Sequence, residues 1–326
     1  MNHNIIIDGA SYRIRPVKLS DAKFIIDIRL ADAERNKFIN KISHDIETQE
    51  EWIKKYLNRN NDYYFVVENL FSGNPEGLIG IYDIQNGRGE WGRWVIERSS
   101  LAAIESVDLI FKAAFDYIGL SEVYCRTITN NHAVVSFHDS LNELKRGVIE
   151  NHVKLDDVLF DVVEHFVPKD YYYENIREVL EGKSLFIYKR NLRKYFGDLE
   201  FHHIGVATSD IEKEFSCYRT FGYRREGKSF TDEIQGIKGQ FIVSDNGPRL
   251  ELLENLPGRN TLDKWIDANV KNYHFAYKIK EFDSMLESIR HKRIRALTKP
   301  EISVYFKKRI CFFVLPNKFI IEFIEV

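Results

Sequence analysis

The second half of the chain repeats itself. HHIGVATSDIEKEF, which begins at His202, aligns at an offset of 71 residues with YHFAYKIKEFDSML, and LELLEN, which begins at Leu250, aligns at the same offset with IEFIEV. Apolar positions match apolar positions almost throughout, and each copy has the pattern of a strand, a helix and further strands. One copy is too small to bury its own sheet face, so we expect two βαβββ modules that pair into one curved sheet.

Four potential metal ligands occupy equivalent positions in the two copies. His203 and His274 lie in the first strand of each copy, and Glu251 and Glu322 lie in the last strand. A single histidine in an apolar strand is more often a hydrogen-bonded core residue, and His202 competes with its neighbour for the role, but the shared offset selects His203. Two imidazoles and two carboxylates nearly neutralise a divalent ion, so we predict a site for Zn, Ni, Co or Mn.

A resemblance to the vicinal-oxygen-chelate superfamily, which includes glyoxalase I and methylmalonyl-CoA epimerase, is carried by HHIGVATSDIEKEF, ELLENLPGRNTLDKWI, YHFAYKI and IIEFIEV. It covers residues 201–326 and implies a metal ion held by the two histidines and two glutamates. It also implies that Glu322 is catalytic and removes a proton next to a substrate carbonyl. The second base of the epimerases falls near Gly239, where Gln235 and Gln240 cannot act as bases. One-base isomerisation, lyase chemistry and binding alone are the open alternatives.

The first half has a different pattern, with a strand, two helices, three strands, a helix, a strand and a helix in order. This order predicts an α+β domain with a mostly antiparallel, mixed sheet and flanking helices. SLFIYKRNL predicts a closing strand at 184–192. We therefore predict a first domain at 1–192, a linker at 193–200 and a second domain at 201–326.

A loop in the first half has the features of a phosphate-binding site. EWGRWVI, a predicted strand, is followed by ERSSLAAIES and a long helix, which places backbone N–H groups at a helix N-terminus. Arg98, Ser99 and Ser100 suit phosphate groups, although a serine here is also an ordinary helix cap. Glu90 and Asp83 are acidic residues near the central strands and are candidates for a general base, and a surface salt bridge to Arg88 or Arg93 is the simpler explanation of Glu90.

Residues 10–192 resemble the GNAT superfamily of acetyl-CoA-dependent N-acetyltransferases, especially those acting on ribosomal proteins and nucleotide-sugar amines. The resemblance is carried by SYRIRPVKLSDAKFI, GLIGIYDI, AAFDYIGLSEVYCRTITNNHAVVSFHDS and KRGVIENHVKLDDVLFDVVEH. It implies acetyl-CoA as cofactor and contacts from the following residues: Val95, Ile96, Glu97, Arg98, Ser99, Ser100, Leu101, Ala102, Ala103 and Asn131.

Five positions depart from that family's usual pattern. Leu101 and Ala103 stand where its loop usually carries glycines, and Asn142 and Glu143 stand where it commonly has Gly-Phe. His138 stands where a tyrosine often protonates the departing CoA thiolate. An imidazolium could serve as that acid, so His138 is our catalytic candidate, with a histidine on the helix surface as the alternative.

Composition restricts the partners. The 326 residues carry 47 Lys and Arg against 49 Asp and Glu, a net charge of -2, which provides no basic field for nucleic acid. The three cysteines are far apart, and no stretch suits a signal peptide or a membrane span, so we expect a cytoplasmic protein with small-molecule substrates. Exposed sheet edges favour a homodimer.

These observations favour a bifunctional enzyme. One half would acetylate an amine, such as that of an aminosugar nucleotide, and the other would use a divalent ion on an oxygen-rich or acyl-CoA substrate. Alternatively, only the metal-binding half is active and the first half is a scaffold or acyl-CoA sensor. As a third hypothesis, the second half sequesters a small molecule without catalysis.

Overall fold

The computed structural model describes residues 3–34, 36–289, 294–315 and 317–326, and the chain divides into two compact units at 1–191 and 192–326. Within those described ranges, no helix combines the length and apolar character needed to cross a membrane.

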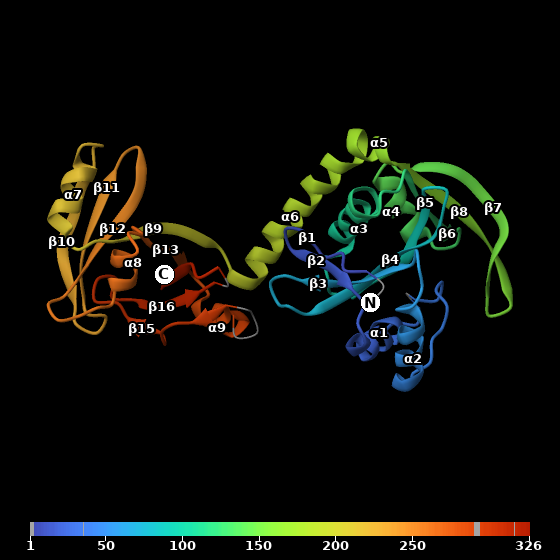
Figure 1. Ribbon diagram of the computed structural model, residues 1–326, viewed down its shortest axis with the longest axis horizontal. Helices are drawn as coiled ribbons and strands as arrows, with labels where there is room; N and C mark the ends of the chain where they lie inside the picture. The colour runs from blue at the N-terminus through green and yellow to red at the C-terminus, as the bar shows by residue number, and fades with distance from the viewer. Residues whose placement is uncertain (1–2, 35, 290–293, 316) are drawn as a thin grey trace. The chain divides into compact units, whose positions relative to one another are not determined.

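The first unit is built on one eight-stranded sheet with the order β1-β2-β3-β4-β5-β6-β8-β7 (Figure 1). All neighbours are antiparallel except β5 and β6, which confirms the predicted mixed, mostly antiparallel sheet. The strands are β1 (Ile7–Asp8), β2 (Tyr12–Pro16), β3 (Tyr63–Asn69), β4 (Pro75–Gln85), β5 (Arg88–Ile96), β6 (Glu122–Ile128), β7 (Leu144–Leu155) and β8 (Val158–Pro168).

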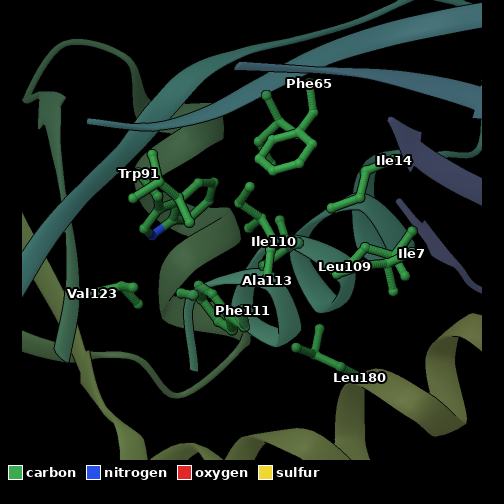
Figure 2. Close-up of a cluster of buried hydrophobic side chains, with 14 of the residues drawn as sticks. Ile7, Ile14, Phe65, Trp91, Leu109, Ile110, Phe111, Ala113, Val123 and Leu180 are labelled. Atoms are coloured by element: carbon green, nitrogen blue, oxygen red, sulfur yellow. The ribbon is translucent and has the colours of Figure 1, made fainter. Parts of the chain in front are cut away.

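Helices cover both faces of this sheet, because alternate residues of its central strands are apolar on both sides. On β3, Tyr64 and Val66 pack with α1 and α2, whereas Phe65 and Val67 pack with α3. Figure 2 shows Phe65 directed at Ile110 of α3. The helices are η1 (Leu19–Asp21), α1 (Ala22–Leu30), α2 (Ile46–Tyr56), α3 (Ala103–Lys112), the π-helical η2 (Ala113–Ile118), α4 (His132–Ser140), α5 (Lys169–Tyr171), η3 (Tyr172–Ile176) and α6 (Arg177–Phe196).

The strand predicted at 184–192 is wrong, because these residues belong to helix α6. Between residues 180 and 191 its buried positions are Leu180, Ser184, Ile187 and Asn191, which recur at intervals of three and four residues, as on one face of a helix. The aromatic and branched side chains suggested a strand, but the period of burial is helical. The predicted linker at 193–200 contains the end of α6 and the start of the next strand, β9.

The second unit contains the predicted pair of βαβββ modules in one sheet. Its strand order is β10-β11-β12-β9-β13-β17-β16-β14, with β15 paired to β16, and the two modules join where β9 and β13 run antiparallel. The first module comprises β9 (Leu199–Ala207), α7 (Ile211–Arg219), β10 (Arg224–Asp232), β11 (Ile237–Ser244) and β12 (Gly247–Asn255), followed by α8 (Asp263–Asp267). The second comprises β13 (Asn272–Ile279), α9 (Phe282–Ile289), β14 (Arg295–Ala296), β15 (Glu301–Ile302), β16 (Arg309–Val314) and β17 (Ile320–Glu325).

Replacing Phe65 by Ala should lower the free energy of unfolding by about 3–5 kcal/mol, because its ring is fully buried between the sheet and α3. Leu185→Ala is the control: that side chain is half exposed, and a change within about 0.5 kcal/mol is expected. Urea unfolding followed by tryptophan fluorescence measures both, since Trp52, Trp91 and Trp94 lie in the first unit. Equal effects of the two substitutions would contradict the assignment of this core.

Candidate active sites

The first unit contains a pocket where two strands separate. β5 pairs with β6 only from Arg88 to Glu90; beyond that point β5 follows β4, while β6 follows β8. A pocket of about 660 Å³ is lined by residues of both strands after they part, among them Val95 and Arg126. The two strands therefore splay apart, and this leaves backbone groups of β5 without a β6 partner.

Glu90 lines this pocket at the point of separation. Arg126 Nη1 donates a hydrogen bond to Glu90 Oε2 at 3.2 Å, and the Tyr82 hydroxyl lies 3.5 Å from Oε1. Burial raises the pKa of Glu90 to about 7; Arg126 opposes that rise, and the nearby acidic groups add to it. The cationic partner of Glu90 is thus Arg126, whereas the sequence suggested Arg88 or Arg93. A carboxylate with this pKa is suited to proton transfer near neutral pH.

The other acidic candidate lies outside the pocket. Asp83 is not among the residues that line it. The residues that sequence reasoning missed are Arg126 and Tyr82, because nothing in the local sequence relates them to Glu90 before β4, β5 and β6 are assembled.

His138 is buried in α4, not exposed on the helix surface, and it also lines the pocket. Its Nδ1 lies 3.0 Å from Glu143 Oε2, and the sulfur of Cys125 lies 3.7 Å from Nδ1 and 3.5 Å from Nε2. The ring of His165 stacks on it with centroids 5.0 Å apart. Burial raises the pKa of the Cys125 thiol, and the charge of Glu143 adds to this effect. The departure from Gly-Phe at 142–143 therefore supplies the carboxylate partner of His138.

The predicted cofactor residues fall into two groups. Val95 of β5 and Asn131, which precedes α4, line the pocket. The remainder belong to the end of β5, the loop that follows and the start of α3, and they are not among its lining residues: Ile96, Glu97, Arg98, Ser99, Ser100, Leu101, Ala102 and Ala103.

In this loop the hydroxyl of Ser100 donates to Glu76 at 2.5 Å and accepts a hydrogen bond from the N–H of Ala102. Ser100 therefore stabilises the loop and does not cap α3, whose N-cap residue is Ala102 without a side-chain cap hydrogen bond. The side chain of Arg98 is exposed, 3.8 Å from Asp32, and is accessible to a ligand in solvent.

The four predicted metal ligands converge in the second unit. They come from the adjacent strands β9, β12, β13 and β17, and all are buried. His203 Nε2 lies 3.1 Å from both Glu251 Oε2 and His274 Nε2, and Glu322 Oε2 lies 3.4 Å from both imidazoles. Around an ion with bonds of about 2.1 Å, neighbouring ligands are separated by roughly 3.0 Å in octahedral and 3.4 Å in tetrahedral geometry. The observed separations match this range.

The electrostatics of the cluster depend on its mutual contacts. Burial would raise the pKa of Glu251, but His203 and His274 outweigh burial and hold that pKa below its usual range. Burial alone would lower the pKa of His274, but Glu251 and Glu322 together outweigh burial and raise that pKa to about 9. Among the described residues, His274 Nδ1 and Glu322 Oε2 have no hydrogen-bond partner. A buried oxygen or nitrogen acceptor that receives no hydrogen bond is unusual, and a bound cation would satisfy it.

Glycine at 205 makes room for this arrangement. A Cβ atom there would lie 2.2 Å from Cε1 of the His274 ring, which packs over Gly205 across β9 and β13. The competing His202 lies outside the cluster: it contacts Arg249, and its Nδ1 is 2.8 Å from that of His203.

A small cavity of about 20 Å³ adjoins Glu251, His274 and Glu322, with room for about one water molecule. Tyr273, Asp232 and Ser303 also line this cavity, and sequence reasoning missed all three. Tyr273 lies directly before a predicted ligand, but a strand neighbour normally faces the opposite side, so its position gave no signal.

At the position of the missing second base, Phe230 fills the space beside Gly239. A Cβ at Gly239 would lie 2.2 Å from its ring. The fold therefore places an aromatic ring where the side chain of the second base would extend. Gln235 and Gln240, which cannot act as bases, do not replace that base. Only Gln235 of the two lines the cavity.

Family comparisons identify both units. Residues 12–141 match the model described as acetyltransferase (GNAT) domain, and residues 202–312 match that of the Glyoxalase/Bleomycin resistance protein/Dioxygenase superfamily. The chain therefore contains a GNAT acetyltransferase domain followed by a glyoxalase-type domain of the vicinal-oxygen-chelate fold, as the sequence predicted. No curated protein matches the chain.

Similar solved structures cover the first unit. One is an apo nucleotide-linked sugar GNAT, FdhC, with 29% identity, TM-score 0.46, and coverage of 55% of this chain and 98% of that chain. A GCN5-related N-acetyltransferase from Brucella melitensis has 17% identity, TM-score 0.50 and coverage of 55% and 85%. The spermidine/spermine N-acetyltransferase SpeG from Vibrio cholerae has 16% identity, TM-score 0.44 and coverage of 51% and 98%. The Brucella structure agrees with the GNAT fold of this unit.

Gly205→Ala should lower the free energy of unfolding of the second unit by about 1–3 kcal/mol, because the new methyl group must displace the His274 ring. Gly182→Ala in α6 is the matched control, since its Cβ would meet no atom within 4 Å and a helical alanine is about 1 kcal/mol more favourable than glycine. Urea unfolding followed by circular dichroism compares them. If Gly205→Ala leaves the free energy of unfolding unchanged, the position of the His274 ring does not depend on this space.

Proposed function

We propose that the chain is a bifunctional enzyme whose first unit transfers an acetyl group from acetyl-CoA to an amine and whose second unit uses a divalent ion for proton transfer next to a carbonyl group. The observation that carries the first activity is a carboxylate with a raised pKa, Glu90, inside a pocket of about 660 Å³ at the strand splay.

Each group in the pocket has a role in the proposed transfer. The amine nitrogen attacks the acetyl carbonyl, the carbon–sulfur bond breaks, and the CoA thiolate leaves. Glu90 accepts the proton lost by the amine, through a water molecule, and Arg126 balances the charge of the carboxylate before it is protonated. His138 is the proposed proton donor to the thiolate, because its ring lines the same pocket and its Nδ1 is oriented by Glu143. The exposed β5 backbone and Asn131 would hold the pantetheine arm.

The same pocket has features that fit an acceptor bearing phosphate. Arg29 and Lys41 line it, and among the described residues the buried Nε of Arg29 has no hydrogen-bond partner. Trp52 and Trp94 add aromatic surface on which a nucleobase or sugar face can pack. A positive, aromatic pocket supports an aminosugar nucleotide, the acceptor suggested by the sequence resemblance.

For the second unit, the donor set fits a divalent ion. His203, His274, Glu251 and Glu322 would hold it. The Glu322 oxygen that makes no hydrogen bond and the space provided by Gly205 support that assignment. When bound, such an ion would polarise a substrate carbonyl and stabilise negative charge as a proton leaves the adjacent carbon.

Glu322 is the proposed base of this reaction, since its carboxylate borders the small cavity. Phe230 occupies the position of a second base, so one-base isomerisation or lyase chemistry fits better than two-base epimerisation. The cavity must open for a substrate larger than water to enter. Tyr273, which lines it, could donate a hydrogen bond to the substrate oxygen.

Two further hypotheses from the sequence make different predictions. If the first unit is only a scaffold or an acyl-CoA sensor, it binds CoA at most and catalyses no transfer. If the second unit only sequesters a small molecule, metal binding is dispensable. The buried, mutually paired His and Glu side chains favour a metal centre over an apolar binding cavity.

Glu90→Gln should lower kcat for acetyl transfer by about 10²- to 10⁴-fold, because glutamine cannot accept the proton. Wild-type activity should rise with pH through about 7, where the raised pKa of Glu90 makes the carboxylate form available, and the variant should lose this limb. Aminosugar nucleotides are screened as acceptors by release of CoA.

Asp83→Asn is the control and should retain the rate at high pH, because Asp83 lies outside the pocket lining, while the pH limb should move to lower pH because the charge of Asp83 contributes to the raised pKa of Glu90. Unchanged kinetics in Glu90→Gln would exclude Glu90 as the base. Absence of CoA binding in calorimetry would contradict both the transferase hypothesis and the acyl-CoA sensor hypothesis.

His274→Ala should remove the metal ion of the second unit, because it deletes one of four converging ligands. Elemental analysis of the purified variant should show one ion per chain fewer than wild type. His152→Ala, at an exposed position of β7, is the control and should leave the content unchanged. Equal metal content in His274→Ala and wild type would refute this metal site.

A further inference from the structure

A ladder of alternating charges crosses neighbouring strands of the first unit. β5, β6, β8 and β7 lie side by side in that order (Figure 1). Carboxylates and guanidinium groups alternate across them, and each side chain contacts the next in the order Glu90, Arg126, Glu164, Arg146, Glu122 and Arg88. The proposed chemistry uses only the first two of these residues.

The guanidinium of Arg126 is shared between two carboxylates. Its Nε donates a hydrogen bond to Glu164 Oε2 at 2.9 Å, and its Nη1 donates one to Glu90 Oε2 at 3.2 Å. Arg126 lies directly opposite Glu164 in the antiparallel pair of β6 and β8, whereas Glu90 lies opposite Tyr124 in the pair of β5 and β6. The strand register therefore gives Glu164 the shorter contact, and Glu90 receives only part of the charge of this cation.

Glu164 is a charged competitor for Arg126. Its side chain is buried, and burial alone would raise its pKa, but Arg146 and Arg126 outweigh burial and hold that pKa below its usual range. Arg146 Nη1 donates to Glu164 Oε1 at 2.7 Å, so each oxygen of this carboxylate contacts a guanidinium group. Glu164 is therefore ionised at the pH values where Glu90 gains and loses its proton.

The other groups that act on Glu90 come from the strands around it. The charged and titratable ones are Tyr82 and Asp83 of β4, Tyr124, Cys125 and Arg126 of β6, and Glu164 of β8. Arg93, on the same strand as Glu90, pairs with Asp62. Arg126 is thus the cation that offsets the burial of Glu90, while the charges of Asp83 and Glu164 add to the effect of burial on its pKa.

We propose that Glu164 is a positioning residue for acetyl transfer: it holds one side of the Arg126 guanidinium, so that Arg126 pairs only partly with Glu90 and Glu90 can take up a proton near neutral pH. A carboxylate paired fully with a cation would be too weak a base, and one without a cation would already be protonated. Sharing the guanidinium gives the intermediate state. The role in acetyl transfer rests on the proposed function of Glu90, whereas the division of Arg126 between two carboxylates does not.

Glu164→Gln keeps the shape of the side chain and removes its charge, so Arg126 becomes free to pair with Glu90. The limb of the pH profile, expected near 7, should move down by about one pH unit. Transfer at pH 6 should then be up to about fivefold faster than in wild type, because more Glu90 is ionised, and no faster at pH 8.5. A merely structural role of Glu164 would lower the rate at every pH.

Glu122→Gln is the matched control. It makes the same change in the same ladder, but Glu122 contacts Arg146 and Arg88 and not Arg126, so the limb should stay in place. Equal shifts in Glu122→Gln and Glu164→Gln would overturn the assignment to Glu164.

Direct titration of Glu90 makes the test independent of catalysis. Carbon-13 NMR of the full-length protein, labelled at its glutamate carboxyl carbons, should show a resonance that titrates near 7, is absent in Glu90→Gln and titrates at lower pH in Glu164→Gln. An unmoved titration in Glu164→Gln would overturn the proposal. A moved titration without acetyl transfer in wild type would support the shared guanidinium and count against the proposed transferase.

Arg126→Lys is a second variant that keeps both carboxylates, for use if Glu164→Gln does not fold. Lysine retains the charge, but its single ammonium group lies opposite Glu164 and should pair with that residue, which leaves Glu90 without a cation. The titration of Glu90 should then move above 7 although the net charge is unchanged. A titration that stays near 7 would overturn the division of Arg126 between the two carboxylates.

Discussion

Compensation of buried charge is the constraint on which both units depend. An isolated carboxylate or imidazolium inside a protein is strongly unfavourable, so each must meet an opposite charge, a hydrogen-bond donor or a cation. In the first unit Glu90 meets Arg126, and Glu143 meets His138. In the second unit two histidines and two glutamates lie against one another. These contacts stabilise each unit and also set the protonation states on which the proposed chemistry depends.

Sheet geometry decides where such groups can gather. β5 and β6 are paired for only three residues, and their divergence creates the pocket beside Glu90. In the second unit β9 and β13 join the two modules, so the first strand of each copy lies at the centre and both histidines meet there. Polar side chains are thus concentrated where strands part or where a pseudo-symmetric sheet brings equivalent positions together.

Much of the fold could be predicted from local pattern. Alternating strands, amphipathic helices and the repeat gave both architectures and the four converging residues of the second unit, because an internal repeat carries long-range information within one sequence. The first unit has no repeat, and its site is less predictable. Glu90 was found by its place near the central strands, but Arg126 lies 36 residues away and became its partner only through the register of β5 and β6.

The sequence by itself determined the α+β pattern of the first domain, the paired modules of the second and the equivalence of His203 with His274, since these follow from periodicity and spacing. Only the tertiary structure decided that Ser184–Leu192 is helical, that His138 is buried against Glu143, and that Phe230 fills the position of a second base. The physical reason is that burial, and with it the pKa and partners of each ionisable group, is a property of the packed sheet and not of the local chain.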